Sequence, residues 1–196
     1  TRTDRFEFQH LGGSAVTETY AFILEHLIEN RHWLETHTEM PAEEIRAFLR
    51  FRALARLYFI RRYAAKILYE IHFHSGRRNP RGKYRQLLSE AYGFPMDEED
   101  AAAYLDDIDA TFYSTDYFRA WLLEAALAGE LETRYGPRWF DEPRAGEYLA
   151  GLWASGNRMT PHELLRALGK RRYSVTNWYR RIRSLMLSDG ACPIHD

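Results

Sequence analysis

The chain has 196 residues, 45% of them hydrophobic, and a formal net charge of −1 at pH 7. This length fits one domain or one large lobe with a buried core. The near-neutral charge gives no global attraction to nucleic acid or anionic lipid, so neither is the expected partner. No apolar run approaches the ~18 residues of a membrane span, and the single Cys192 leaves no disulfide within the chain, which favours a cytoplasmic protein.

Helical periodicity dominates the first half of the chain. Residues 1–13 are expected to form a loop or extended entry, and Ser14 is expected to cap a helix that runs to about residues 32–35. A long helix is predicted over residues 43–74, because apolar residues recur there at helical spacing. The predicted apolar stripe of this helix comprises Ile45, Phe48, Leu49, Leu57, Ile60, Ala64, Ile67, Leu68 and Ile71.

Glycines and prolines divide the second half into shorter segments. Residues 76–82 are predicted to be a loop. Helices are then expected over residues 83–92, 109–129, 143–155, 161–168 and 174–187, with Gly129 ending the second of them. No strand or hairpin signal interrupts these segments. The fold class should therefore be all-α, an irregular multi-helix arrangement in a single domain over residues 1–196, with residues 157–190 as a candidate helical tail subdomain.

Two carboxylates stand out in the first helix. "ETYAFILE" places Glu18 and Glu25 seven residues apart, hence on one helix face. This segment resembles the E-T-x-S/A-x-x-x-E helix of the zinc metallopeptidases of the thimet oligopeptidase and oligoendopeptidase F family, and "FQHLGGSAVTE" resembles the linker before it. Two further segments, "FYSTDYFRAWLLEAALAGEL" and "YLAGLWASGNRMTPHELLRALG", resemble the family's Tyr-rich segment and its helical tail, in the same order.

The resemblance implies the C-terminal catalytic lobe of a gluzincin-type peptidase that hydrolyses peptides. It implies that Glu18 is the third zinc ligand and that Glu25 orients a ligand histidine. A helix-dipole carboxylate is the alternative for Glu18, and a salt bridge to an arginine of the next helix is the alternative for Glu25. The resemblance also implies that Tyr117, with Tyr113 second, donates a hydrogen bond to the tetrahedral intermediate, against the alternative of core aromatics. Arg119 is a candidate for gripping a substrate carboxylate, or for an ion pair with Asp116.

The sequence contains no H-E-x-x-H motif, which supplies two zinc ligands and the general base in such enzymes. The chain also opens on Thr1 rather than Met. Both features favour a C-terminal fragment whose partner would be the N-terminal remainder of the same enzyme. The isolated chain is then expected to lack bound zinc and to be inactive, although a degenerate family member would have the same features.

Two other classes of protein stay open. "MTPHELLRALGKRRYSVTNWYRRIRSLM" has the pattern of a DNA-binding helix-turn-helix. Its second helix would carry Thr176, Asn177, Tyr179 and Arg180, within a locally basic segment that includes Lys170, Arg171, Arg172, Arg181 and Arg183. A non-catalytic helical scaffold is the other alternative.

Overall fold

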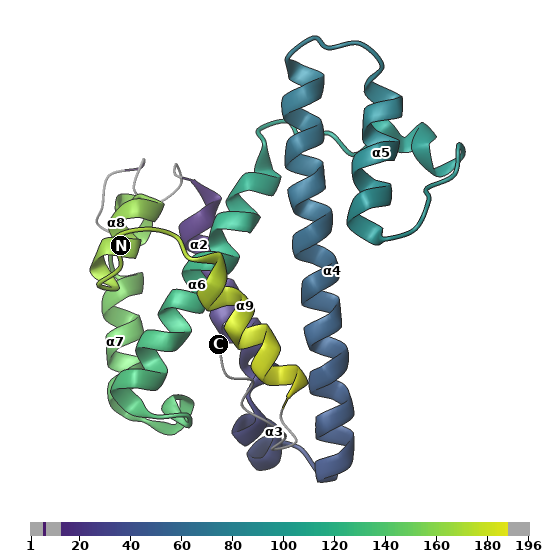
Figure 1. The fold of residues 1–196 in the computed structure, drawn as a ribbon. Helices are drawn as coiled ribbons and strands as arrows, with labels where there is room; N and C mark the ends of the chain where they lie inside the picture. Colours follow the sequence, from purple (N-terminus) through teal and green to yellow (C-terminus); the bar gives the residue numbers. More distant parts are fainter. Residues whose placement is uncertain (1–5, 7–12, 188–196) are drawn as a thin grey trace. The chain divides into compact units, whose positions relative to one another are not determined.

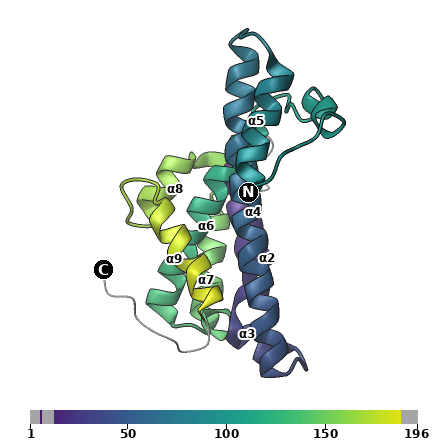
Figure 2. The same cartoon turned by 45° about the vertical axis from the view of Figure 1, so that its right-hand side comes forward.

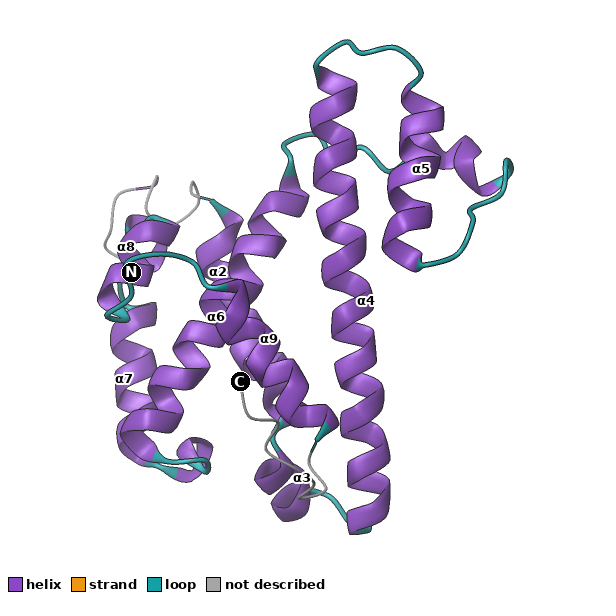
Figure 3. Cartoon of the chain, in the orientation of Figure 1, coloured by secondary structure: helices purple, strands orange, loops and turns teal. Residues whose placement is uncertain are grey.

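The computed structural model describes residue 6 and residues 13–187. Within these residues the chain forms only helices and loops (Figure 3), so the all-α expectation is confirmed. The α-helices in chain order are α2 (Ser14–Glu25), α3 (Arg31–His37), α4 (Ala42–His74), α5 (Pro80–Tyr92), α6 (Tyr113–Tyr135), α7 (Pro143–Trp153), α8 (Pro161–Ala167) and α9 (Val175–Met186) (Figure 1). Short 3-10 turns η1 (His26–Glu29), η2 (Asp100–Tyr104), η3 (Trp139–Asp141) and η4 (Gly156–Arg158) lie between them.

The chain divides into two compact units. The first unit combines residues 1–53 with residues 119–196, and the second unit is the segment 54–118. Helices α4 and α6 each contribute residues to both units. Whether the whole chain folds as one cooperative domain, as expected from the sequence, stays a prediction.

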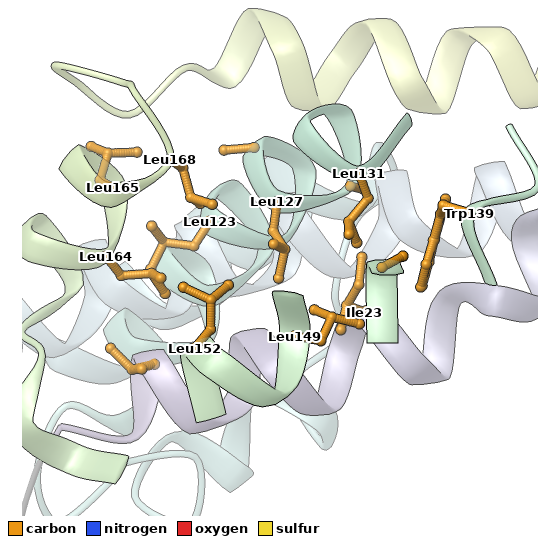
Figure 4. Close-up of a cluster of buried hydrophobic side chains, with 14 residues drawn as sticks. Ile23, Leu123, Leu127, Leu131, Trp139, Leu149, Leu152, Leu164, Leu165 and Leu168 are labelled. Atoms are coloured by element: carbon orange, nitrogen blue, oxygen red, sulfur yellow. The ribbon is translucent and has the colours of Figure 1, made fainter. Parts of the chain in front are cut away.

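The core of the first unit is built around α6. Three leucines spaced four residues apart give α6 an apolar stripe, and side chains of α2, α7 and α8 pack against it (Figure 4). The large residues of this cluster are Ile23, Leu123, Leu127, Leu131, Trp139, Leu149, Leu152, Leu164, Leu165 and Leu168. Burying an aliphatic side chain of this size contributes roughly 2 kcal/mol, so this cluster fixes α2 and α6 against each other.

The core of the second unit joins α4 to α5, which lie beside each other in both ribbon views (Figure 2). Tyr69 of α4 is fully buried, and its ring meets that of Tyr84 edge-on at a centroid distance of 4.9 Å. The Tyr69 hydroxyl donates a hydrogen bond to the carbonyl of Tyr104 at 2.6 Å. This bond satisfies the polar end of the buried phenol and ties η2 to α4.

The last two predicted helices, 161–168 and 174–187, are confirmed as α8 and α9, and each begins with a side-chain cap. Thr160 and Glu163 form a reciprocal capping box at the start of α8, and Ser174 accepts a hydrogen bond from the backbone N–H of Asn177 at the start of α9. Gly169, between the two helices, has φ of +70°, a conformation that favours glycine. Both helices lie in the predicted tail segment 157–190, of which residues 188–190 lie outside the described residues.

The prediction for the first helix is wrong at both ends. Gly13, not Ser14, occupies the N-cap position of α2, and no side chain caps it. The helix ends at Glu25, because the chain turns through η1 to an extended Asn30 that caps α3. The Asn30 side chain accepts from Trp33 N–H and donates to the carbonyl of Pro137 at 2.9 Å. Most of the predicted entry loop lies outside the described residues.

The helix end predicted at Gly129 and the bounds predicted for the loop 76–82 are also wrong. Helix α6 continues through Gly129 and ends before Gly136, whose φ is +82°. Burial of Leu127 and Leu131 on either side of Gly129 outweighs the cost of one helical glycine, about 1 kcal/mol. The predicted loop 76–82 is shorter than expected, because α5 begins at Pro80 with Asn79 as its cap.

The long helix is confirmed as α4, and Ile60 of its predicted apolar stripe is buried, but the stripe is wrong at Leu68 and Ile71. Leu68 and Ile71 are exposed, while Tyr69, Lys66 and Glu70 are buried. The helix therefore turns a polar set of side chains inward along this stretch, and that polar set forms part of the candidate site.

Candidate functional site

Helix α2 holds the two carboxylates that the sequence singled out. Glu18 and Glu25 are two turns apart and lie on the same side of the helix. The side that α2 packs into the core carries Val16, Thr19 and Ile23, all buried. Glu18 is partly buried and Glu25 is exposed, so both carboxylates lie outside the apolar contact.

Glu25 lies near an arginine of α4. Its carboxylate is 3.9 Å from the guanidinium of Arg52, which pairs more closely with the buried Glu29 at 3.0 Å. The Glu25 side chain keeps 55% of its surface exposed. An exposed ion pair of this length contributes at most a few tenths of a kcal/mol, so Glu25 stays available to another partner.

The most deeply buried carboxylate of the first unit is Glu124, which sequence reasoning missed. It lies on α6 with no exposed side-chain surface, and its carboxylate is 3.5 Å from Nδ1 of His26. The His26 ring also stacks on Phe22 at a centroid distance of 5.5 Å. A signal was available, since Glu124 is the one charged residue in the otherwise apolar run 120–128, and a buried acid requires a partner.

The carboxylates and the histidine described above do not form a metal site by themselves. In the described part of the chain, no group of three or more His, Cys, Asp or Glu side chains is arranged to hold a metal ion. A zinc site in a peptidase needs three protein ligands and an open position. Zinc therefore does not fit the described residues alone, and Glu18 can contribute at most one ligand of a set completed elsewhere.

The two candidate catalytic tyrosines lie together in the second unit. Tyr113 and Tyr117 occupy the first two turns of α6, and their rings meet edge-on at a centroid distance of 4.9 Å. The ring of Tyr63, from α4, lies 5.7 Å from that of Tyr117. All three are partly exposed. Sequence reasoning missed Tyr63, because one more aromatic residue on a long aromatic-rich helix carries no distinguishing pattern.

The start of α6 is held by Asp109. One Asp109 carboxylate oxygen accepts hydrogen bonds from the backbone N–H and the hydroxyl of Ser114, at 2.9 and 2.6 Å. The other oxygen accepts from Lys66 at 2.8 Å, and the Asp109 N–H donates to Glu70 at 2.7 Å. Lys66, Glu70, Asp109 and Ser114 are called the Asp109 clamp below. No sequence pattern distinguishes Asp109 from the other acids of "DDIDAT".

The clamp encloses a strained residue. Phe112, directly before α6, has φ of +54°, a region that costs a bulky residue roughly 1–2 kcal/mol. The residues on both sides of it are fixed, Asp109 by the clamp and Thr115 by its N–H bond to the Phe112 carbonyl at 2.8 Å. This strain is thus balanced by hydrogen bonds that set the direction in which Tyr113 leaves the loop.

The pKa values of the clamp's two acids, Asp109 and Glu70, are shifted in opposite directions. Burial raises the pKa of Asp109, but the hydrogen bonds from Lys66 and Ser114 outweigh it and hold the pKa below its usual value. Burial raises the pKa of Glu70 above its usual value, against the opposing effect of the Asp109 N–H. The second carboxylate oxygen of Glu70 is buried and accepts no hydrogen bond from the described residues.

Arg119 lies on α6, two residues beyond Tyr117, and is exposed. Residues two apart on a helix do not face each other, so the helix does not direct Arg119 and Tyr117 to one spot. Arg119, Glu18 and Glu25 belong to the first unit, whereas Tyr113 and Tyr117 belong to the second. The structure thus describes the carboxylates and the tyrosines as two separate groups.

Along residues 13–187, none of the helices combines the length and the apolar character needed to cross a membrane. Comparison with protein-family models, with curated proteins and with solved structures gave no match.

Proposed function

We propose that this chain is the C-terminal helical part of a cytoplasmic, zinc-dependent peptidase that hydrolyses peptides. The observation that carries the proposal is the placement of Glu18 and Glu25 on one side of α2, whose other side is buried. A carboxylate fixed on a packed helix is a ligand type that zinc peptidases use. Glu18 is the proposed ligand, and the nearby Glu25 would orient a ligand histidine by hydrogen bonding.

The proposal requires polypeptide outside these 196 residues. The sequence has no H-E-x-x-H motif, so two histidine ligands and the general base must come from elsewhere in the intact enzyme. Zinc there would polarise the scissile carbonyl and lower the pKa of a bound water. The chain by itself should neither retain zinc nor cleave peptides.

The tyrosines supply the second part of the proposal. Tyr117 would donate a hydrogen bond to the oxyanion that forms when the peptide carbonyl is attacked, and Tyr113 is the neighbouring donor. Their partly exposed rings, 4.9 Å apart at the clamped start of α6, support this role. A donor that is held in place before the reaction is more effective than a mobile one. The exposed Arg119 would bind a carboxylate of the peptide.

The first experiment is to read the coding segment upstream of Thr1, and the second is to measure zinc stoichiometry. An upstream H-E-x-x-H is expected, and its absence would overturn the proposal. The extended protein should bind about one zinc per chain, whereas the 196-residue chain should bind none. Glu18→Ala in the extended protein should lose the zinc. Glu147→Ala is the matched control, because Glu147 is an exposed glutamate on α7 and its removal should leave zinc bound. If Glu18→Ala retains zinc as well as Glu147→Ala does, Glu18 is not a ligand.

A further inference from the structure

Charge is segregated along this chain. Residues 164–187 contain seven Lys and Arg residues and no Asp or Glu, although the whole chain has a net charge of −1. This segment spans the end of α8, the loop after it and all of α9. We propose that five of its cations, the exposed Lys170, Arg171, Arg172 and Arg180 and the partly buried Arg183, form a surface that binds the phosphate backbone of a nucleic acid. These five residues are called the basic face below.

Helix α9 presents two residues of the basic face, Arg180 and Arg183, on a fixed support. Trp178 and Ile182 are buried against the first unit, and Asn177 and Arg180 are exposed. Arg180 and Arg183 are three residues apart, hence neighbours on the helix surface. Because the buried side anchors the helix, these cations are held in place before a ligand binds, which lowers the entropic cost of binding.

The cations of the basic face have no carboxylate counter-ion within the part of the chain that the structure describes. Arg181 pairs with Glu132 of α6 at 2.8 Å, but none of the five residues of the basic face forms an ion pair with a carboxylate in the described ranges. Unpaired cations on one face repel each other at low salt, and an external polyanion relieves that repulsion. Four of the five are arginines, whose planar fork matches phosphate oxygens in a bidentate way.

A hollow lies within this surface. Lys170, Asn177 and Arg180 line a pocket of about 240 Å³ together with the Arg181–Glu132 pair. The α6 side of the pocket is formed by the small residues Ala125, Ala126 and Gly129 together with Glu132 and Thr133. Small side chains there leave room for an anionic group to reach the cations.

Nucleic acid fits this surface better than a membrane does. A helix that binds lipid exposes a continuous apolar stripe beside its cations, whereas the apolar stripe of α9, with Trp178 and Ile182, is buried in the protein. Exposed Asn177 supplies an amide for base edges, and exposed Tyr179 supplies a ring for stacking. The order α8, glycine turn, α9 is also that of a helix-turn-helix, whose second helix meets the DNA. This surface does not depend on the peptidase proposal.

The test is fluorescence polarisation with the 196-residue chain, a short labelled DNA duplex and the matching single strand, across a salt series. The chain is expected to bind at least one of the two DNA forms, with an affinity that falls steeply as the salt concentration rises. The form that binds with the higher affinity is the preferred ligand. Arg180→Gln/Arg183→Gln should weaken binding on the order of tenfold or more at low salt and reduce the slope of log affinity against log salt by about 2. Arg171→Gln/Arg172→Gln, in the loop before α9, should have the same effect without changing a helix.

The matched control is Arg77→Gln/Arg78→Gln, which removes two exposed arginines from the loop before α5. This control should leave both the affinity and the salt slope unchanged. An equal loss in the control and test variants would overturn the proposal, because it would reflect total charge alone. Failure of both DNA forms to bind would also overturn it, as would tighter binding to phosphatidylserine vesicles or to polyglutamate. Circular dichroism of each variant verifies that helix content is retained.

Discussion

Lys66 and Asp109 form a short ion pair, with 2.8 Å between the ammonium nitrogen and a carboxylate oxygen. They are 43 residues apart in the sequence, and their pairing fixes the loop that precedes α6. The Lys66 side chain is 10% exposed and that of Asp109 is 25% exposed. The pair therefore lies at the edge of the second unit's core, where solvent screens it only in part.

Removing the charge of Asp109 should destabilise the protein. Asp109→Asn leaves Lys66 with a weaker partner and replaces one acceptor of the clamp with a donor. We expect the free energy of unfolding to fall by about 2 kcal/mol, since hydrogen bonds to charged groups contribute that much. Urea denaturation followed by circular dichroism measures the loss. Asp106→Asn is the control, because exposed Asp106 should change stability by less than about 0.5 kcal/mol. Equal effects from the two variants would contradict the importance of the clamp.

The same carboxylate predicts an acid limb in the stability curve. Because the pKa of folded Asp109 lies below its unfolded value, its ionised form stabilises the fold above about pH 4. That contribution is lost as the pH falls through the folded pKa. The free energy of unfolding should therefore fall in acid in the wild type, and less so in Asp109→Asn. Parallel pH profiles for the two proteins would exclude this role.

Glu70 should give the stability of the protein a pH dependence of the opposite sign to that of Asp109. Its folded pKa is raised, so the neutral acid stabilises the fold fully below about pH 4.3, and this contribution is lost as the pH rises through the folded pKa. Glu70→Gln keeps the oxygen that accepts from the Asp109 N–H but cannot ionise. The wild type should lose stability relative to Glu70→Gln as the pH rises, which urea titrations at a series of pH values will detect. A pH-independent difference between the two proteins would show that Glu70 does not titrate in this way.

Gly129 inside α6 and Gly136 directly after it should respond in opposite directions to the same substitution. Gly129→Ala should stabilise the protein by about 0.5–1 kcal/mol, because Gly129 lies inside α6 and an added methyl group meets no atom within 4 Å. Gly136→Ala should destabilise it by roughly 1–2 kcal/mol, because φ at Gly136 is +82°. Thermal unfolding of both variants measures the two shifts. A stabilising effect at both positions would contradict the observed end of α6.

Tyr117→Phe tests the proposed chemistry in the extended, zinc-loaded protein. Loss of one oxyanion donor should lower kcat about 100-fold, while zinc content and KM change little. Tyr113→Phe should have a smaller effect. Tyr58→Phe, at an exposed tyrosine of α4, is the matched control and should retain activity. If Tyr117→Phe retains full activity, its hydroxyl does not stabilise the transition state.

Local patterns were sufficient for much of the fold. The extents of α4 and α9 depend on short-range patterns, and the structure has both helices within one residue of the predicted ranges 43–74 and 174–187. These features depend on hydrogen bonds and backbone angles within a few residues. The placement of Glu18 and Glu25 on the same side of α2 follows from the same helical regularity.

Only the tertiary structure decided which side of each helix is buried and which charges meet. Leu68 and Ile71 are exposed while Lys66 and Glu70 are buried, because Asp109, about 40 residues away in sequence, supplies their hydrogen-bonding partner. Glu124 is buried 3.5 Å from Nδ1 of His26, which lies in η1. Helix α6 continues past Gly129 because Leu127 and Leu131, which precede and follow this glycine, are both buried. The sequence by itself determined the local elements, whereas these choices depend on long-range burial and pairing energies that exceed local propensities of about 1 kcal/mol.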